Sequence, residues 1–448
     1  MKRKVDNYTF LTTQPVGSVI RHMAVPTIVS MLVISIYNIV DTYYVGLIST
    51  QATAAVGVAF PFMTIMQAIA FFLGQGSGTY ISRQLGAQEH HHATRMAATA
   101  FYTSLVVGVI FAAVGLIFMR PLAVLFGSTP TILPYTCDYL LPIMLVAPFT
   151  IGSMVLNNQM RFQGNASSSM LGMMAGAVLN VALVPLFTFY FNMGILGTGV
   201  GTGLSQVAGF LVLWVMTRHG GNIKMQWGNI ALRKVYFIEI IKGGTPSLTR
   251  QGLASVSTLL LNLAAGEYGD AAIAGMSIVT RVSFVVFAVI IGIGQGFQPF
   301  CGFNYGGKFY ARVKEGYIYS LKLCLAFLLP SCVVGFIWAE SVIDALRHDP
   351  HVVVVGMVAL RWQILTWPLA AFITITNMCL QTSGRTLAAN VLAAARNGIC
   401  FIPLILLLPR LLGLQGVEMT QTVADVVSFS IAVPLAVHYF RSLSGMGR

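Results

Sequence analysis

The chain has 448 residues, of which 56% are hydrophobic and only 9% are charged. Soluble domains carry about 25% charged residues, so this composition excludes a water-soluble globular protein. Apolar stretches follow one another along the whole sequence, and we therefore expect a polytopic membrane protein. The net charge of +13 would suggest a nucleic-acid partner in a soluble protein, but here the charges must first be compared with membrane topology.

Twelve apolar windows are long enough to cross a bilayer, six on each side of a basic connector. They predict an all-α fold with a six-helix lobe over residues 1–217, a cytoplasmic linker over 218–234 and a second six-helix lobe over 235–448. The windows are 17–44, 52–80, 96–118, 132–160, 168–190, 195–217, 236–265, 271–300, 311–338, 352–380, 387–408 and 415–440.

Lysine and arginine gather on one side of these windows. Of the 26, 20 fall on the side of the termini and only Arg120, Arg347 and Arg410 fall on the other. By the positive-inside rule, both termini and the linker are expected in the cytoplasm. Membrane orientation thus explains the basic charge, and no nucleic-acid partner is expected.

The two halves of the chain repeat at a constant offset of 220 residues. Pro26, Gly46, Gly86, Pro148 and Asn157 have counterparts at Pro246, Gly266, Gly306, Pro368 and Asn377. Because each half has an even number of helices, both have the same orientation, related by a pseudo-twofold axis along the membrane normal. This arrangement is typical of secondary transporters with a substrate site between the halves.

Other energy sources and activities find no support in the motifs. The sequence has no Walker-type phosphate loop, HExxH pair or GxSxG elbow, so we expect neither an ATP-driven pump nor an enzyme. His90, His91 and His92 lack nearby cysteines or a second histidine cluster, so no metal site is expected. The two halves differ too much in charge for a symmetric channel pore.

Several motifs, in this order, resemble the multidrug and toxic compound extrusion (MATE) family. They are Pro26 and Asp41 in the first window, Gly-Gln-Gly at 74–76 and 294–296, Arg-Phe-Gln-Gly-Asn at 161–165 and Gly-Ile-Leu-Gly at 194–197. The resemblance covers essentially the whole chain. It implies a V-shaped pair of bundles in the bacterial inner membrane that exports bulky, often cationic drugs in exchange for protons or sodium ions. The expected partners are small drugs and the lipid bilayer, with no cofactor and a monomeric state.

Asp41 is the sharpest candidate for the coupling site, because an ionisable residue within a span is costly and is a functional candidate by default. Pro26, Tyr37 and Asp41 follow helical spacing and give the first helix a polar stripe. The alternative is an aspartate that simply touches water at the outer helix end.

Depth counting brings further polar residues to the level of Asp41. At about 1.5 Å per residue, four residues of later helices reach the outer half of the bilayer: Asp138, Tyr139, Asn180 and Thr202. The resemblance to the MATE family places a proton or cation site there in the first lobe.

One departure from the family pattern bears on the coupling ion. The family commonly has an acid four residues after the asparagine of the fifth helix, where this chain has Val184. A hard cation prefers several oxygens and usually more than one charge, so this valine favours a proton on Asp41 over sodium. A compensating role for Asp138 stays open.

These residues suggest a mechanism. Asp41 would take up a proton from the outer side and thereby lose the charge that attracts a cationic drug. The first helix lacks an internal hydrogen bond at Pro26, so it can bend there and close the cavity. Proton and drug would then compete for one lobe.

The second lobe carries Arg250, Arg281 and Arg361 within spans and Asp425 in the last helix. The favoured interpretation is a buried Arg361–Asp425 pair, because an unpaired charge in the membrane is so unfavourable; a role in substrate binding or gating is the alternative. The three arginines also leave open a lipid-linked sugar flippase of the same superfamily. Asn157 and Asn377 occur in both lobes and suggest a structural hydrogen bond common to the repeat.

Overall fold

The structure, a computed structural model, describes residues 6–219 and 221–446, except for the side chains of Tyr37, Asn38, Ile39 and Thr42. Within those residues every regular element is a helix. The first half comprises α1 (Asn7–Thr13), α2 (Val16–Gly46), α3 (Thr50–Gly86), α4 (His90–Ile117), α5 (Met119–Leu125), α6 (Leu133–Leu145), α7 (Ala147–Phe162), α8 (Ala166–Pro185), η1 (Leu186–Tyr190), α9 (Gly194–Met216) and η2 (Trp227–Asn229). The second comprises α10 (Lys234–Gly266), α11 (Asp270–Gly306), α12 (Tyr310–Ile337), α13 (Ala339–Leu346), α14 (Pro350–Thr382), α15 (Thr386–Ala394), η3 (Ala395–Ile399), α16 (Phe401–Leu412) and α17 (Leu414–Met446).

The predicted all-α fold with twelve spans is confirmed. Among the described residues, ten helices are long and apolar enough to cross a membrane, and the bent pair α6–α7 adds an eleventh. The remaining span is α10, which is more polar because it carries Glu239, Lys242 and Arg250.

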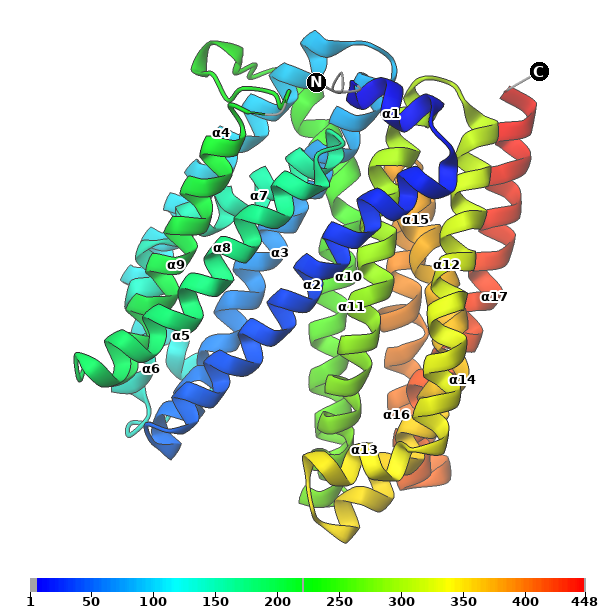
Figure 1. Ribbon diagram of the computed structural model, residues 1–448. Helices are drawn as coiled ribbons and strands as arrows, with labels where there is room; N and C mark the ends of the chain where they lie inside the picture. Colours follow the sequence, from blue (N-terminus) through cyan, green and yellow to red (C-terminus); the bar gives the residue numbers. More distant parts are fainter. Residues whose placement is uncertain (1–5, 220, 447–448) are drawn as a thin grey trace.

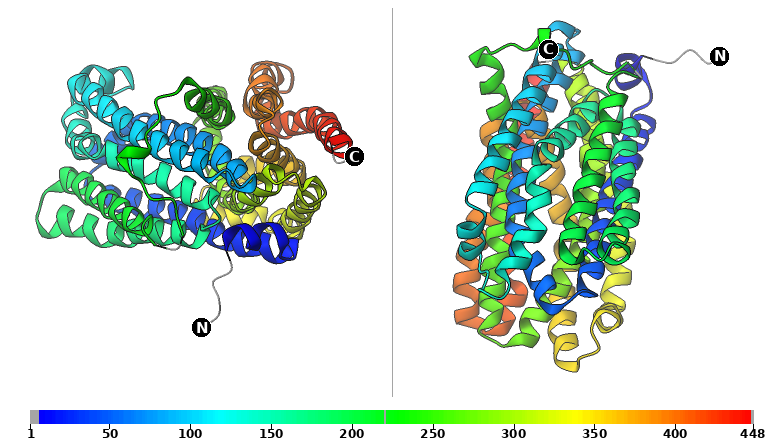
Figure 2. Two further views of the ribbon diagram at one scale, coloured as in Figure 1. Left: turned by 90° about the horizontal axis from the view of Figure 1, so that it is seen from above. Right: turned by 90° about the vertical axis from the view of Figure 1, so that its left-hand side faces the viewer.

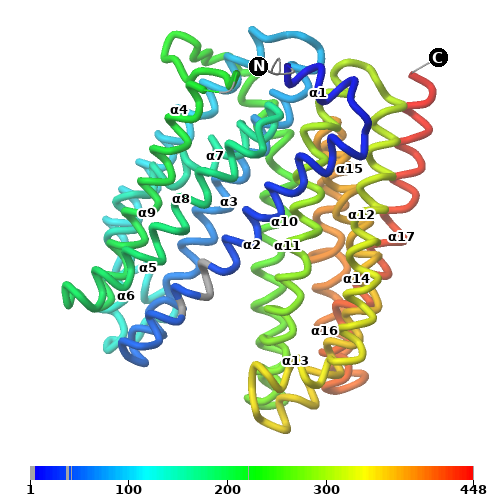
Figure 3. The backbone as a smooth tube through the Cα atoms, in the orientation of Figure 1, coloured from blue at the N-terminus to red at the C-terminus, as the bar shows by residue number. Residues whose placement is uncertain are grey.

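The helices form two bundles arranged as a V (Figure 1). The first bundle holds α3 to α9 and the second holds α11 to α17, side by side when viewed from above (Figure 2). The terminal side of the molecule carries α1 and the end of α17, and there the bundles meet. Towards the opposite side they diverge, as the backbone tube makes clear (Figure 3).

Two long helices connect the bundles by exchanging their first turns. Val19, Ile20 and Met23 of α2 are buried in the hydrophobic core of the second bundle, although the outer half of α2 packs along α8 of the first. In return, Tyr236 and Ile240 of α10 are buried in the core of the first bundle. Each bundle is therefore completed by the first turns of a helix that continues into the other half of the molecule.

Glycines permit the close helix crossings where the bundles meet. A Cβ at Gly292 of α11 would lie 2.7 Å from the Cα of Ile28, and one at Gly296 would lie 2.6 Å from the Cα of Ala24, both on α2. The repeat-related pair Gly86 and Gly306 lies at the ends of α3 and α11, where a Cβ on either would overlap the backbone of the other helix. The V is thus closed at the terminal side by backbone-to-backbone packing.

The span predicted over 132–160 is broken, whereas its counterpart in the second bundle is continuous. α6 and α7 meet at an angle of 54° around Val146. Both spans share a proline, Pro148 in α7 and Pro368 in α14, but only the first has an additional Pro142. Each proline removes a backbone donor, so two within less than two turns explain the break.

Candidate functional site

The carboxylate of Asp41 lies near the outer end of α2 and points into the first bundle. The side chain is only 6% exposed. The Tyr139 hydroxyl of α6 donates to Oδ2 at 3.3 Å, and the Thr202 hydroxyl of α9 approaches Oδ1 at 3.5 Å. Three helices far apart in sequence therefore meet at one carboxylate.

A fourth helix, α8, adds Asn180 to this cluster. Its amide nitrogen donates to the Thr202 hydroxyl at 3.2 Å, and its Oδ1 is buried without a hydrogen-bond partner in the described structure. Val184 follows one turn later and is fully buried against Gly201 of α9. The place of the second family carboxylate is thus filled by an apolar side chain in a tight helix contact.

Of the six residues predicted for coupling, the structure brings four together: Asp41, Tyr139, Asn180 and Thr202. The side chain of Tyr37 lies outside the described residues. Asp138 does not belong to the cluster, because its side chain is exposed. Neighbouring residues of a helix point about 100° apart, so Tyr139 facing inward turns Asp138 outward, and the idea that Asp138 compensates for Val184 is wrong.

Pro26 lies where α2 crosses from the second bundle to the first. The helix continues through it without a break, and the hydroxyl of Thr27 donates to the carbonyl of Met23 at 2.7 Å. A side-chain hydroxyl therefore bonds to backbone next to the missing proline donor, as is common in membrane helices. In this conformation Pro26 is a weak point in an intact helix, and bending there stays a prediction.

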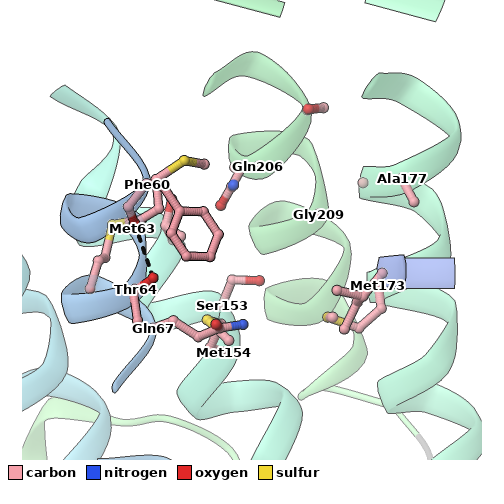
Figure 4. A pocket seen from close by; sticks show the side chains of 16 residues that line it. Phe60, Met63, Thr64, Gln67, Ser153, Met154, Met173, Ala177, Gln206 and Gly209 are labelled. Carbon is pink, nitrogen blue, oxygen red and sulfur yellow. Dashed lines mark hydrogen bonds between the residues drawn. The ribbon is translucent and has the colours of Figure 1, made fainter. Parts of the chain in front are cut away.

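A cavity of about 220 Å³ opens beside the Asp41 cluster, between α2, α3, α7, α8 and α9 (Figure 4). Its lining is uncharged and consists of methionine, phenylalanine, short polar and small residues: Ile34, Phe60, Met63, Thr64, Met66, Gln67, Thr150, Ser153, Met154, Gly172, Met173, Gly176, Ala177, Ser205, Gln206 and Gly209. Methionine adapts its shape to different ligands, and the amides and hydroxyls offer both donors and acceptors. Such a lining suits bulky apolar molecules with a few polar groups.

Two lining residues connect the cavity to the coupling cluster. The sulfur of Met63 lies 4.0 Å from the Tyr139 hydroxyl, and the Ser205 hydroxyl donates to the Thr202 carbonyl at 2.8 Å. A ligand that displaces Met63 would therefore act on the Tyr139 hydroxyl, whereas Ser205 contacts only the backbone of Thr202.

The sequence did not predict this cavity. Gly172 packs closely against Leu213, and Gly176 packs against the backbone of Ser205 and Gly209. They also line the cavity, because a helix face without side chains leaves space beside the contact. Their signal in the sequence was the combination of small residues with Gln206 and Ser205 on the facing helix.

The predicted Arg361–Asp425 pair is wrong. Asp425 is bound instead by Arg396, whose Nε lies 2.8 Å from Oδ1, and it also accepts from Gln421 at 2.8 Å and from Thr366 at 3.4 Å. Arg361 bonds to the Phe336 carbonyl at 3.3 Å. Arg396 lies within the predicted window 387–408, in the π-helical turn η3.

The Arg396–Asp425 pair fills the place that the cavity takes in the first bundle. Arg396 is the repeat counterpart of Gly176, and Phe287, over which its guanidinium lies at 4.4 Å, is the counterpart of Gln67. Both first-bundle residues line the cavity. The repeat thus has an open cavity in one bundle and an ion pair in the other.

The asparagines common to both halves have the predicted structural role. Asn157 donates to the Ser169 carbonyl at 3.0 Å, and Asn377 donates to the Ala389 carbonyl at 2.6 Å. The donors and the acceptors of the two bonds are both related by the repeat offset of 220 residues. Arg250 is held by the second of these asparagines, since its Nη1 donates to Asn377 Oδ1 at 2.8 Å.

Arg281 is exposed on α11. It precedes Gly292 by about three helical turns and so lies on the same helix face. At Gly292 that face touches α2, and nearer the open side it faces the space between the diverging bundles. Arg281 therefore brings a positive charge to the mouth of the V.

Comparisons with known proteins agree with this architecture. The family model MatE matches residues 26–186 and 246–407, once in each half. The multidrug export protein MepA of Staphylococcus haemolyticus (strain JCSC1435) is 28% identical over 415 residues, which cover 92% of this chain and 91% of the relative. MepA of Staphylococcus aureus (strain MRSA252) is 26% identical over 445 residues, or 98% of this chain and 97% of the relative.

Solved structures share the fold. A MATE structure in the straight conformation superposes with a TM-score of 0.93 at 22% identity, over 99% of this chain and 100% of that one. A transporter from Pyrococcus furiosus, described as having a binding pocket of reversed polarity, gives a TM-score of 0.92 at 21% identity over the same shares. The chain therefore belongs to the multidrug and toxic compound extrusion (MATE) family, and it is a membrane transporter rather than an enzyme.

Proposed function

We propose that this protein is a proton-coupled exporter of bulky lipophilic drugs, often cationic, in the bacterial inner membrane, with the terminal side in the cytoplasm. One observation carries the proposal. The buried carboxylate of Asp41 lies on a helix that connects the two bundles, and its donor Tyr139 lies 4.0 Å from Met63, which lines the cavity of about 220 Å³. The names of the MepA relatives support multidrug export.

The composition of the Asp41 cluster supports a proton as the coupling ion. Only one carboxylate is present, and Val184 fills the second acidic position with apolar atoms. Two hydroxyls donate to that carboxylate, which suits its charged form. A sodium ion would have to be bound by this single carboxylate, whereas hard cations are usually bound by several oxygen ligands and more than one negative charge.

Protonation of Asp41 would change the hydrogen bonds around it. A neutral carboxyl group is itself a donor and a weaker acceptor than a carboxylate, so the bonds from Tyr139 and Thr202 would weaken and the new O–H would need an acceptor. The unpaired Oδ1 of Asn180, next to Thr202, supplies a spare acceptor. The rearrangement reaches the cavity through Met63, and this is how proton uptake would release the drug.

The conformation seen here would release drug and take up protons. The V opens away from the terminal side, which is the outer side if the termini are cytoplasmic (Figures 1 and 3). Export then requires the bundles to separate at the terminal side and close at the other. Both movements involve α2, which belongs to both bundles.

The test is efflux of a fluorescent lipophilic cation from proteoliposomes with proton and sodium gradients imposed separately. We expect efflux driven by the proton gradient and unaffected by sodium. Asp41→Asn should abolish proton-driven efflux while the protein still binds the dye, and Asp138→Asn, the same change at an exposed aspartate, should leave efflux intact. Full proton-driven efflux by the folded Asp41→Asn protein would refute the coupling assignment, and sodium-driven efflux would refute the choice of ion.

A second candidate function, export of an anionic amphiphile such as a lipid-linked sugar, is favoured by the position of Arg281. The carboxylates of Asp41, Glu418 and Asp425 are buried inside the bundles, whereas Arg281 is exposed at the mouth of the V. Arg281→Gln distinguishes the two functions. Loss of anionic cargo transport with unchanged cation efflux would support the second, and improved cation efflux alone would support the first.

A further inference from the structure

A groove on the outer face of the second bundle lies far from the cavity and the V. Its walls are α12 and α17, which touch little, and its floor is α14, which packs against both. The groove has a volume of about 760 Å³, within the range of about 300–1,000 Å³ that is usual for small-molecule sites. α17 lies at the periphery of the molecule, so the groove opens towards the surrounding bilayer (Figures 1 and 2).

The lining divides into an apolar stretch and a polar rim. Val433, Ala436, Val437 and Phe440 follow one face of α17, and Phe372 of α14 forms the floor. From Arg441 back to Val433 the wall extends about 12 Å at 1.5 Å per residue, which is long enough to hold a large part of an acyl chain. Val437 is 43% exposed, so the wall is accessible.

The rim is positively charged and lies at the terminal side. Lys314 of α12 and Arg441 of α17 stand on opposite walls, with Ser444 beside the arginine, and both cations are exposed. Neither has a carboxylate among the residues that line the groove. Tyr317 stays on the floor, because its hydroxyl is bonded to Thr376 at 2.7 Å and its ring packs against Phe440 at 4.7 Å.

We infer that this groove binds an anionic phospholipid of the leaflet on the terminal side. Its headgroup phosphate lies between Lys314 and Arg441, and an acyl chain lies along Val433, Val437 and Phe372. Two basic residues at the headgroup level and an apolar channel below them match a lipid better than a soluble anion, which would gain nothing from the channel. Basic pockets between membrane helices on the cytoplasmic side recognise anionic headgroups in this way.

The experiment measures lipid binding to the full-length protein in detergent by native mass spectrometry, with phosphatidylglycerol and phosphatidylcholine as probes. The wild type should bind phosphatidylglycerol more tightly. The double variant Lys314→Gln/Arg441→Gln should bind it roughly 30-fold more weakly, since each basic residue near the headgroups contributes about 1 kcal/mol, or about fivefold. Val437→Trp, which fills the channel and leaves both charges, should also weaken it.

The matched control is Arg218→Gln/Lys224→Gln, which removes two exposed positive charges from the terminal side of the first bundle. It should leave phosphatidylglycerol binding within about twofold of wild type. Equal binding of both lipids, or equal losses in the two double variants, would overturn the site. Displacement of the lipid by inorganic phosphate with no effect of Val437→Trp would show a simple anion site and would also overturn it.

Discussion

The hydroxyl of Tyr139 lies between Asp41 and the cavity, at 3.3 Å from the carboxylate and 4.0 Å from Met63. Tyr139→Phe removes this one group and keeps the ring. A hydrogen bond to a charged acceptor contributes about 1.5 kcal/mol or more, so we expect proton-driven efflux to fall about tenfold. Dye efflux from proteoliposomes measures it, with Tyr43→Phe, the same change at an exposed tyrosine of α2, as the control. Equal efflux by both variants would contradict a role for the hydroxyl.

The asparagine pair gives a prediction about stability. Asn157→Ala and Asn377→Ala each remove a buried side-chain hydrogen bond to a helix carbonyl, at a cost of about 0.5–1.5 kcal/mol. Asn377→Ala should be the more destabilising, because it also removes the oxygen that accepts from Arg250. Thermal unfolding in detergent with a thiol-reactive dye measures the difference. A larger loss in Asn157→Ala would contradict this order.

At the residue scale the sequence predicted depth better than direction. Counting along helices placed Asp41, Tyr139, Asn180 and Thr202 at one level, and they meet. The same counting also placed Asp138 there, because depth alone does not tell which way a side chain points around the helix. The partner of Asp425 was missed for a related reason, since the linear pattern does not tell which of the arginines within the spans, Arg396 in the window 387–408 included, faces the last helix.

Among the elements, the broken span α6–α7 positions Tyr139 one turn before Pro142. Pro142→Ala should make this span resemble the continuous α14, which has only the shared proline. An interior proline costs about 3 kcal/mol, so the variant should be more stable, with a bend smaller than 54°. Its efflux should fall because Tyr139 moves relative to Asp41.

A structure of the Pro142→Ala variant measures the bend directly, and efflux measures the consequence. Pro61→Ala, in the continuous helix α3, is the control for the loss of a proline as such. A variant that keeps the full bend would show that Pro148 and packing are sufficient to break the span.

Hydropathy predicted the long elements well and the short ones not at all. Twenty or more apolar residues fix a span whatever surrounds it. The helices α5 and α13, which are repeat-related, have seven and eight residues and are shorter than any hydropathy window. The exchange of first turns between α2 and α10 was equally hidden, because both bundles offer the same apolar environment to a helix.

For the whole molecule, Gly86 and Gly306 give a prediction about the equilibrium between the state that is closed at the terminal side and the state that is open there. Gly86→Ala and Gly306→Ala each put a Cβ onto the backbone of the opposite helix, so both should destabilise the state that is closed at the terminal side. Spin labels at the exposed Thr131 and His351 should then report shorter distances across the open side. Gly46→Ala and Gly266→Ala are the matched controls, since a Cβ there meets nothing within 3.4 Å.

The salt bridge between α3 and the first turns of α10 makes a second prediction at this scale. Arg83 of α3 lies 2.9 Å from Glu239 of α10, with side-chain exposures of 19% and 22%. Arg83→Gln and Glu239→Gln should each destabilise the state that is closed at the terminal side by about 0.5–1 kcal/mol. The distances between the same two labels report this change in population. The double variant should be no worse than either single one. Lys242→Gln, 3.7 Å from Glu239 and mostly exposed, should change little, and additive single effects would show that the pair does not act as a unit.

The V itself could not be derived from the residues alone. The 220-residue repeat fixes the relation between the halves but not the angle at which they lean apart, which depends on contacts such as Gly296 against Ala24. Two arrangements of the same bundles satisfy the same apolar windows, as expected of a protein that has to alternate between them.

Arg161 lies where the bundles close and is 2% exposed. Among the described residues its guanidinium donates to two amide oxygens, Gln295 at 2.6 Å and Asn158 at 2.5 Å, and its Nε is buried without a partner. Burying a cation without a carboxylate is unfavourable, and the penalty disappears once water reaches it. The buried Arg161 therefore destabilises the closed arrangement at the terminal side. Separation of the bundles lets the guanidinium be hydrated, which brings the two end states closer in energy and lets a modest ion gradient drive the cycle.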